Sequence, residues 1–277
     1  MASKSSLQGG IAAASGIGKE VAFAFAESGA RMVLFADIND AGAENAARKS
    51  ADYATALKYN SFSFKVDVTD EQSILDMVDY IVRKLGRIDY FVNCAGVSSI
   101  PSATTDHLKG DFFDKMMQVN VKGTELCLRA VAAAMMKQEP LEYTSRRHGT
   151  RSLGRGSIFT LGFVNSFAVA PGILIYAASQ RAVIDIAKST AMELRSEKIR
   201  VNAVCPSLVD TPMMDTWLRE FPGLAASVLT MSPPGRTAKV DEVADYIVFL
   251  CSPSASYISE TALRIDSGMT LTAEAPS

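Results

Sequence analysis

The stretch "ASGIGKEVAFAFAESGARMVLFAD", Ala14 to Asp37, decides the fold of this chain. Its first part is a helical pattern that closes at Gly29, a residue type that commonly follows a helix C-terminus. Its second part, Arg31 to Asp37, is an apolar run with the length of a buried strand. A helix that leads into a buried strand is typical of a parallel sheet covered by helices.

The same alternation continues along the chain. Short β-branched and aromatic runs predict further strands at residues 63–68, 88–96, 156–162, 199–206 and 262–266. Helical patterns lie between them at residues 70–86, 120–137 and 176–196. The first of these patterns closes at a glycine, Gly86. No repeat or linker divides the pattern. We therefore expect one α/β domain over residues 1–277, built on a single doubly wound parallel sheet.

Composition excludes several classes of function. The 277 residues are 48% hydrophobic and carry a net charge of -2, so no electrostatic footprint indicates nucleic acid or an anionic membrane. No apolar run approaches the roughly 20 residues of a membrane span, and the N-terminus lacks a secretory core, which predicts a cytoplasmic protein. The four cysteines are far apart and only two histidines are present, so we expect no metal site.

Two segments interrupt the regular pattern. Residues 138–155 are polar and basic without periodicity, which predicts a solvated surface loop more readily than a binding segment. Residues 207–238 follow a strand end and contain a bulky apolar part at 211–236. Such an insertion beyond the carboxyl end of a parallel strand is where a substrate lid would lie, although satellite core or a subunit contact would have the same composition.

Seven motifs occur in an order and spacing that resemble the short-chain dehydrogenase/reductase family over nearly the whole chain. They are "ASGIGKE" (14–20), "DVTD" (67–70), "VNCAG" (92–96), "VNVKGT" (119–124), "YAAS" (176–179), "IRVNAVCPSLVDTPM" (199–213) and "RIDSG" (264–268). With its long basic segment before residue 155, the chain looks like fungal tailoring members of that family. The resemblance implies a Rossmann-type sheet of about seven strands, a nicotinamide cofactor at its carboxyl edge, and a homodimer or homotetramer.

The cofactor loop departs from the family's pattern. Gly16, Ile17 and Gly18 are kept, but Ile11 and Ala12 occupy the positions of the family's Thr-Gly pair. The segment before the loop is about four residues shorter than the resemblance implies, so the first strand is predicted to be short or missing. Both outcomes would weaken the dinucleotide site, and we expect NAD(P) to be absent or weakly bound.

Other positions match the family's cofactor contacts. Asp37 closes the second predicted strand 19 positions after Gly18, where a carboxylate would bind a ribose hydroxyl and favour NAD over NADP. A solvated carboxylate at a strand end explains Asp37 equally well. The remaining matches to adenine-side or nicotinamide-side positions are Asp67, Val68, Asn93, Gly96 and Thr211.

The catalytic positions are half conserved relative to the family's pattern. Asn120 and Tyr176 match the family's asparagine and tyrosine, whereas Phe163 stands in place of the serine and Gln180 in place of the lysine. An unperturbed tyrosine is a phenolate in only about one molecule in a thousand at neutral pH, and a neutral glutamine cannot change that. Tyr176 should therefore remain a phenol. Arg181 is a rescue candidate, but one residue along a helix turns a side chain by roughly 100°.

The residue at the serine position also predicts an apolar substrate pocket. Phe163 removes a hydroxyl donor and adds aromatic surface, and further bulky side chains lie nearby in the sequence, so we predict a substrate pocket formed by Phe163, Phe167, Met213, Met214 and Trp217.

Three functions fit these residues. The first is a biosynthetic enzyme that cyclises, isomerises or protonates a large apolar metabolite with the help of Tyr176 and Asn120, its redox chemistry being lost or secondary. The second is a NAD(P)(H)-dependent dehydrogenase or reductase with an unusual proton relay. The third is a non-catalytic protein that binds a ligand or partner. The departures from the family's pattern affect both the proton relay and the cofactor site, and this favours the first function.

Overall fold

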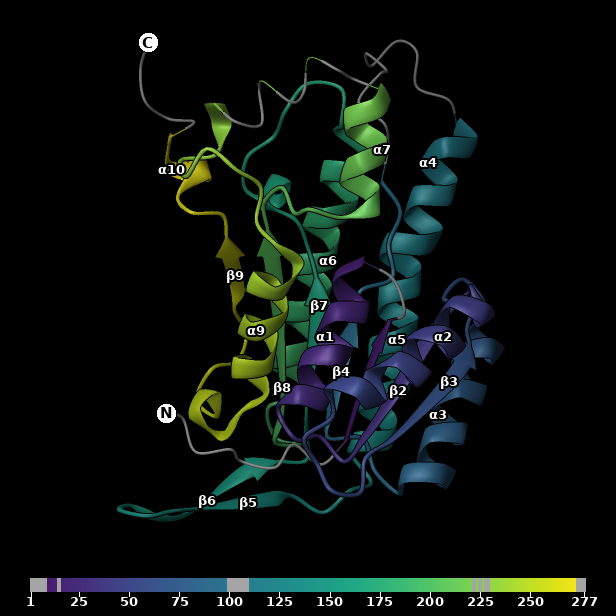
Figure 1. Cartoon of the computed structure of the whole chain (residues 1–277), viewed down its shortest axis with the longest axis vertical. Helices are drawn as coiled ribbons and strands as arrows, with labels where there is room; N and C mark the ends of the chain where they lie inside the picture. Colours follow the sequence, from purple (N-terminus) through teal and green to yellow (C-terminus); the bar gives the residue numbers. More distant parts are fainter. Residues whose placement is uncertain are drawn as a thin grey trace.

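A seven-stranded parallel sheet organises the chain. The computed structural model describes residues 9–13, 16–98, 110–220, 223, 226 and 230–272. The strand order is β3-β2-β1-β4-β7-β8-β9, and all neighbouring strands in this sheet run parallel (Figure 1). The bounds are β1 Gly9–Ala13, β2 Met32–Asp37, β3 Asn60–Lys65, β4 Tyr90–Asn93, β7 Gly156–Leu161, β8 Ile199–Pro206 and β9 Ala262–Ile265. The order reverses direction at β1 and β4, as in a doubly wound Rossmann fold.

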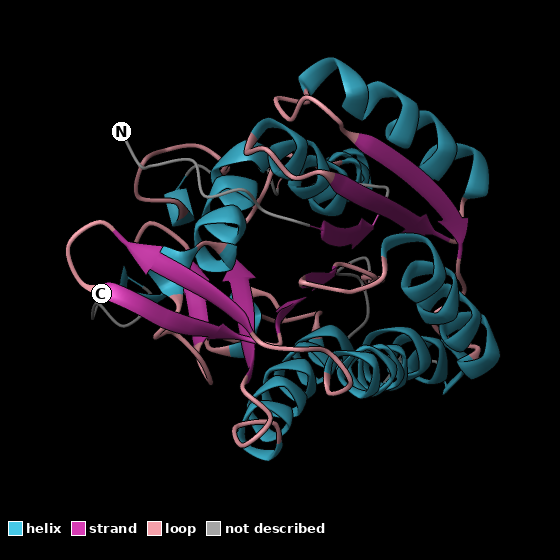
Figure 2. Cartoon of the chain, turned by 90° about the horizontal axis from the view of Figure 1, so that it is seen from below, coloured by secondary structure: helices cyan, strands magenta, loops and turns pink. Residues whose placement is uncertain are grey.

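Helices cover both faces of the sheet (Figure 2). Buried side chains of α1 (Gly16–Glu27), α2 (Asp40–Ser50) and α9 (Val240–Cys251) pack into one apolar cluster with the strands. Those of α3 (Glu71–Leu85), α5 (Gly123–Met135) and α6 (Leu174–Glu193) form a second cluster on the other face. Central strands are therefore buried on both sides, which explains their continuous apolar sequences.

The first strand is present and short. Over its five residues, β1 pairs with β2 from Gly9 to Ala13, and with β4 at Gly10 and Ile11. Strand pairing is made by backbone groups, so a segment with Gly and Ala can still hold the central place. The alternative of a missing strand is excluded, and α1 begins where a Rossmann fold requires it.

Several predicted boundaries are confirmed. β8 occupies residues 199–206 as predicted. Asp70 caps the start of α3 by accepting a hydrogen bond from the backbone N–H of Gln72, and Gly86 ends it in the left-handed conformation with φ 78°. By contrast β3 starts at Asn60, three residues before the predicted 63, and it ends at Lys65, before the predicted 68, because Asp67 Oδ1 accepts hydrogen bonds from Thr69 and turns the chain there.

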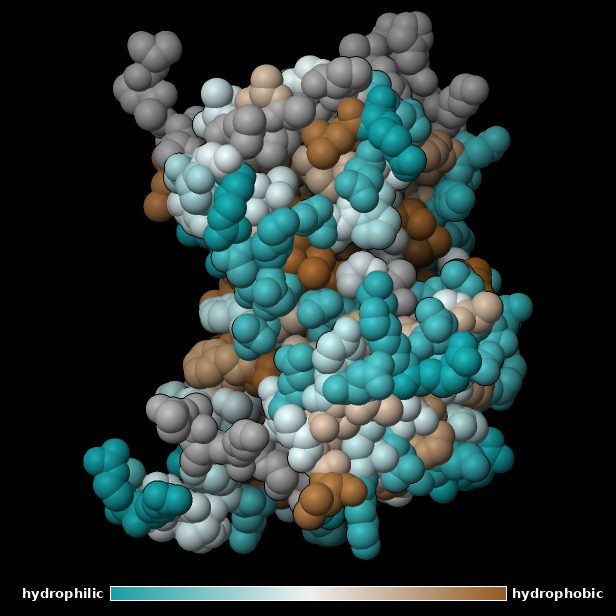
Figure 3. All heavy atoms as spheres, viewed as in Figure 1, coloured by the Kyte–Doolittle hydropathy of each residue, from teal (hydrophilic) through white to brown (hydrophobic). Residues whose placement is uncertain are grey.

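The predicted surface loop at 138–155 is wrong in its secondary structure. It forms an antiparallel hairpin of β5 (Leu141–Ser145) and β6 (Gly149–Gly154), whose tip is the hydrophilic projection at the lower left of Figure 3. The hydroxyls of Thr144 and Thr150 bond across the strands at 2.9 Å, and the Arg151 guanidinium lies 4.8 Å from the centre of the Tyr143 ring. Such cross-strand pairs stabilise a hairpin without a hydrophobic core.

The long helix predicted at 120–137 also has a different start. It continues from α4 (Gly110–Met116) through one wider π-helical turn, Met117–Lys122, into α5. A π turn inside a helix is often found at a functional site, and this one contains Asn120.

Gly154 should be essential to the join between the hairpin and β7. Its φ is +86°, and an added Cβ would overlap the backbone carbonyl oxygen of Lys198. We predict that Gly154→Ala lowers the free energy of unfolding by about 3 kcal/mol or more, because backbone strain and overlap add. Urea unfolding followed by circular dichroism measures the loss.

Gly149→Ala is the matched control for this prediction. Gly149 has φ +71° but no atom within 4 Å of an added Cβ, so its alanine variant carries the backbone penalty alone, about 1 kcal/mol. Equal losses in the two variants would contradict the steric explanation.

Candidate active site

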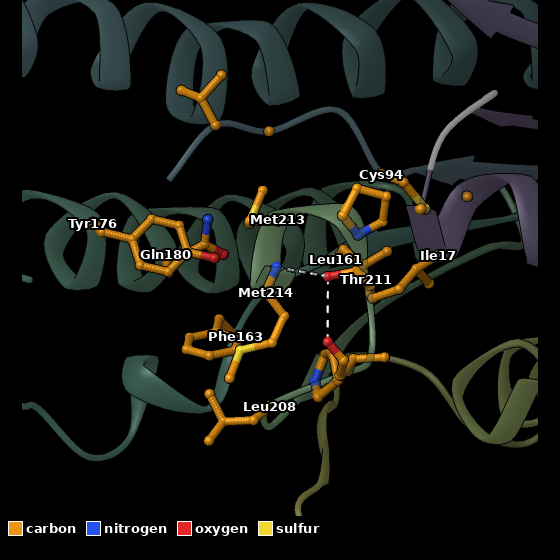
Figure 4. Close-up of a pocket in the computed structure, with 18 of the residues that line it drawn as sticks. Ile17, Cys94, Leu161, Phe163, Tyr176, Gln180, Leu208, Thr211, Met213 and Met214 are labelled. Carbon is orange, nitrogen blue, oxygen red and sulfur yellow. Dashed lines mark hydrogen bonds between the residues drawn. The ribbon is translucent and has the colours of Figure 1, made fainter. Parts of the chain in front are cut away.

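An apolar cavity of about 230 Å³ opens where the carboxyl ends of β4, β7 and β8 meet the start of α1 (Figure 4). In doubly wound folds, ligands bind in the crevice at the carboxyl edge of the sheet. The lining residues are Gly16, Ile17, Gly18, Cys94, Ala95, Gly96, Val97, Leu161, Gly162, Phe163, Tyr176, Gln180, Pro206, Ser207, Leu208, Val209, Thr211, Pro212, Met213, Met214 and Trp217. None of these side chains is charged at neutral pH.

Aromatic rings and methionines form one wall of the cavity. The ring centre of Tyr176 lies 5.5 Å from that of Phe163 and 6.3 Å from that of Trp217, the latter pair meeting edge to face at 84°. Such geometries are favourable beyond the area they bury. Of the five residues predicted to form the substrate pocket, the structure brings four together: Phe163, Met213, Met214 and Trp217.

Phe167 does not line the cavity. A short helical turn, Val164–Ser166, follows Phe163 and directs the chain away, so that the Phe167 side chain is 39% exposed. Its ring lies 5.3 Å from the guanidinium carbon of Arg264 instead. The prediction for this residue is corrected: composition alone could not show where the turn would point it.

The predicted lid is an amphipathic helix over part of its length. Its described portion contains α7, Pro212–Glu220, which lies beyond the carboxyl ends of the strands in Figure 1. Thr211 starts this helix by accepting a hydrogen bond from Met214 N at 3.3 Å. Trp217 Nε1 donates to Ser98 Oγ at 3.2 Å, which ties α7 to the loop after β4. Sequence reasoning did not identify Ser98 or the lining residue Leu208; both follow strand ends, a position that could have indicated them.

Tyr176 lies in the first turns of α6 and is 7% exposed. No described residue forms a hydrogen bond with its hydroxyl, and burial without a nearby cation raises the pKa of Tyr176 above its ordinary value. The prediction of a neutral phenol is therefore strengthened. A raised pKa makes Tyr176 a poor base and also a poor proton donor, but leaves its hydroxyl free to donate a hydrogen bond.

Gln180 is one helical turn after Tyr176 and lines the same cavity. It is buried, and its Oε1 atom accepts no hydrogen bond from a described residue. The rescue by Arg181 is not found: the Arg181 guanidinium donates from Nε to the carbonyl oxygen of Ser166 at 3.0 Å and is not among the described lining residues. No cationic side chain among the described residues pairs with Tyr176.

Asn120 supports the cavity wall from behind. Its Oδ1 accepts from Val97 N at 2.8 Å, while Nδ2 donates to Val97 O at 2.9 Å and to Ser179 Oγ at 3.0 Å. Ser179 Oγ in turn donates to the carbonyl oxygen of Tyr176 at 2.8 Å. The Asn120 amide thus joins the loop after β4 to α6 and positions Tyr176, and it does not line the cavity itself.

The phosphate end of the cavity fits an anion. Gly16, Ile17 and Gly18 lie at the N-terminus of α1, where backbone N–H groups and the helix dipole favour negative charge, and no acidic residue lies in the first turn. Gly16 has φ +50° and no atom within 4 Å of an added Cβ, which leaves room for close approach of a ligand. A dinucleotide pyrophosphate would fit here. At the opposite end, with Gln180, no described lining residue supplies the cation that would hold a nicotinamide ribose.

The other predicted cofactor residues divide into two groups. Gly96 and Thr211 line the cavity. Asp37 lies at the end of β2, outside the cavity, and its Oδ1 accepts from Asn39 N at 2.9 Å, so it shapes the turn before α2.

Asp67, Val68 and Asn93 also lie outside the cavity and hold the surrounding framework. Bonds from Thr69 lower the pKa of Asp67. Val68 packs against Gly123, where a Cβ would come within 2.9 Å of its side chain, and Asn93 Nδ2 donates to Thr124 Oγ1 at 3.0 Å.

Comparison with known proteins agrees with this fold and site. The family model described as enoyl-(acyl carrier protein) reductase matches residues 10–270. The short-chain dehydrogenase fogB of Aspergillus ruber is 40% identical, over 93% of this chain and 94% of that protein. The short-chain dehydrogenase anuF of Penicillium roqueforti is 38% identical, over 94% of each. The family model and these relatives each cover nearly the whole chain. The chain therefore belongs to the short-chain dehydrogenase/reductase family.

Solved structures show the same architecture. A short-chain type dehydrogenase/reductase from Mycobacterium ulcerans superposes with a TM-score of 0.85 at 24% identity, covering 96% of this chain and 92% of that one, which supports the fold alone. The 3-ketoacyl-(acyl-carrier-protein) reductase of Brucella melitensis, solved in complex with NADH, superposes with a TM-score of 0.79 at 26% identity, over 96% of this chain and 99% of that one.

Among the residues that the structure describes, no helix is long and apolar enough to cross a membrane. Within the same residues no group of three or more His, Cys, Asp or Glu side chains is placed to hold a metal ion.

Removing the Tyr176 hydroxyl should show that this phenol ionises only at a pH above that of an exposed tyrosine. We predict that the tyrosinate absorbance of wild type minus that of Tyr176→Phe stays near zero up to about pH 10, where an exposed tyrosine is half ionised. Because burial raises the folded-state pKa above the unfolded one, the stability linked to this phenol is present below about pH 10 and is lost as the pH rises through the folded pKa. A tyrosinate signal from Tyr176 near neutral pH would refute the neutral-phenol interpretation.

Proposed function

We propose that this chain is a biosynthetic enzyme that binds a large apolar secondary metabolite in the cavity and promotes its cyclisation or isomerisation without net redox change. Hydride transfer is lost or secondary. The observation that carries the proposal is the buried Tyr176 hydroxyl, surrounded by Phe163, Trp217 and Gln180 in a cavity whose described lining bears no charged side chain. A site of this kind favours an uncharged, largely apolar ligand.

Tyr176 acts in this proposal as a fixed hydrogen-bond donor. Its O–H donates to a carbonyl oxygen of the substrate, and the bond strengthens as negative charge develops on that oxygen in the transition state. The phenol keeps its proton because burial raises its pKa, so Tyr176 donates a hydrogen bond without transferring a proton. Cyclisation or isomerisation retains every atom of the substrate. A single preorganised donor of this type contributes roughly 10²–10³ in rate. Asn120 acts indirectly, through Ser179 and the start of α6.

The aromatic wall contributes orientation and water exclusion. Phe163, Met214 and Trp217 present rigid apolar surface that selects a folded conformation of the substrate, which lowers the entropy cost of ring closure. The link from Trp217 to Ser98 holds α7 over the cavity. We further propose that the functional unit is a homodimer or homotetramer.

A NAD(H)-dependent dehydrogenase or reductase is the second candidate. It is favoured by the N-terminus of α1 at the cavity and by the relatives, which are named as dehydrogenases and reductases. A bound nicotinamide would supply or accept a hydride. In that case Gly16 to Gly18 would hold the pyrophosphate, and Asp37 would favour NAD over NADP. Gln180 cannot supply the positive charge that would make Tyr176 an effective acid or base.

Calorimetric titration with NADH and NADPH distinguishes the two candidates. We predict no saturable binding in the micromolar range for either cofactor, because no cation lies among the described residues at the Tyr176 end of the cavity. A micromolar dissociation constant for either would overturn the non-redox proposal and favour the second candidate.

The double variant Phe163→Ser/Gln180→Lys is the positive control for this titration. β1 and α1 are in place, so returning a hydroxyl and a cation should tighten NADH binding measurably over wild type. A double variant no better than wild type would show that the weakness lies elsewhere in the site.

Tyr176→Phe should weaken the binding of carbonyl compounds specifically. Trp217 is the only tryptophan in the chain and lines the cavity, so its fluorescence reports occupancy. We predict that the variant binds para-pentylacetophenone about fivefold more weakly, the loss of one hydrogen bond, while pentylbenzene binds as it does to wild type. Unchanged affinity for the ketone would remove Tyr176 from the proposed mechanism.

A further inference from the structure

Two buried glutamines in this chain have opposite hydrogen-bonding states. Gln138 is 9% exposed, and its amide is fully used: Oε1 accepts from Ile88 N at 2.6 Å, and Nε2 donates to Ile88 O at 2.9 Å and Arg155 O at 2.7 Å. Gln180 is 5% exposed, yet its Oε1 accepts no hydrogen bond from a described residue. Buried polar atoms are normally paired, so the unpaired Oε1 of Gln180 requires an explanation.

The position of Gln180 indicates a ligand. It lines the cavity with Tyr176, four residues earlier on α6, and residues at this spacing lie on one face of a helix. Figure 4 shows both side chains at the same end of the cavity, opposite Ile17 and Cys94. A glutamine needed only to fill space would be better replaced by an apolar residue, since an unpaired buried acceptor lowers stability.

The two polar groups have complementary roles. The Tyr176 hydroxyl can donate to an acceptor, while the Gln180 amide presents an unpaired acceptor, Oε1, beside the donor Nε2, so its acceptor is satisfied only by a ligand that offers a donor. The terminal torsion of a glutamine is soft, so the amide can turn toward a ligand at little cost. A ligand that offers an acceptor and a donor side by side would satisfy both groups. A carboxylate would not, because it has no donor and its charge would be buried in a cavity with no charged group in its described lining.

We infer that Gln180 is a specificity-determining residue for a neutral substrate that carries a carbonyl acceptor next to an N–H or O–H donor on an apolar skeleton. Carboxamides, lactams and hydroxy-ketones have this arrangement. The inference deepens the proposed function and rests on it. A site built to pair a polar group rejects an analogue that lacks the partner, because its own polar atom then stays unpaired.

Two probes of similar size test the inference. Para-pentylbenzamide offers a carbonyl and N–H groups, whereas methyl para-pentylbenzoate offers acceptors only. Trp217 fluorescence reports the binding of each. We expect wild type to bind the amide about tenfold more tightly than the ester, a preference of about 1.4 kcal/mol. In Gln180→Met the amide should lose about tenfold in affinity and the ester should bind as before.

Two further variants separate recognition from folding. Gln72→Met makes the same change on an exposed helix position and should leave both probe affinities unaltered. Gln138→Met removes three hydrogen bonds and should lower the urea midpoint, whereas Gln180→Met should keep or raise it, since no bond to a described residue is lost. A Gln180→Met variant as unstable as Gln138→Met would overturn the inference.

The remaining outcomes distinguish this inference from the proposed function. Equal binding of amide and ester to wild type overturns the inference alone. Micromolar NADH binding with an intact amide preference overturns the non-redox function and supports the inference. If Gln180→Met weakens NADH and leaves the amide preference unchanged, the glutamine serves a cofactor and the inference is wrong. Failure of both probes to bind overturns both.

Discussion

The pairing of β1 with β2 on one side and β4 on the other is the constraint on which this structure depends. It fixes the centre of the sheet and the point at which the strand order reverses. Because β1 ends at Ala13 and α1 begins at Gly16, the helix N-terminus is held at the carboxyl edge of the sheet. Backbone hydrogen bonds accomplish this with five residues of Gly, Ile and Ala.

The cavity inherits its two unlike ends from that arrangement. Its α1 end presents backbone N–H groups and an open Gly16, which suit an anion. Its α6 end presents Tyr176 and Gln180 among aromatic rings and methionines, which suit an uncharged apolar group. The Asn120 amide holds the second end in place by bonding the loop after β4 and Ser179 at once. The polarity of the cavity therefore changes along its length.

Sequence periodicity predicted the sheet because buried parallel strands leave apolar runs, as at β2. It missed the β5–β6 hairpin, whose exposed strands are held by pairs such as Thr144 with Thr150 and leave no such run. Motif spacing brought Tyr176, Phe163 and Gln180 together correctly. It could not place Phe167, which depends on the direction of one turn, or show that the Asn120 amide is used up by backbone and Ser179 partners.

The presence of β1 changes how the departures from the family's pattern are weighed. A missing first strand would have removed the dinucleotide site as a whole, but the strand is paired on both sides and Gly16 to Gly18 lie at the N-terminus of α1. The loss of the Thr-Gly pair at Ile11 and Ala12 remains, and the two further departures, Phe163 and Gln180, lie at the end of the cavity where substrate chemistry occurs in this fold. Both replace a group that assists proton transfer with one that is neutral or apolar. The aromatic rings around the Tyr176 hydroxyl accompany these two replacements, and this combination of an apolar wall with a phenol that has no cation among its described neighbours is what supports the non-redox proposal.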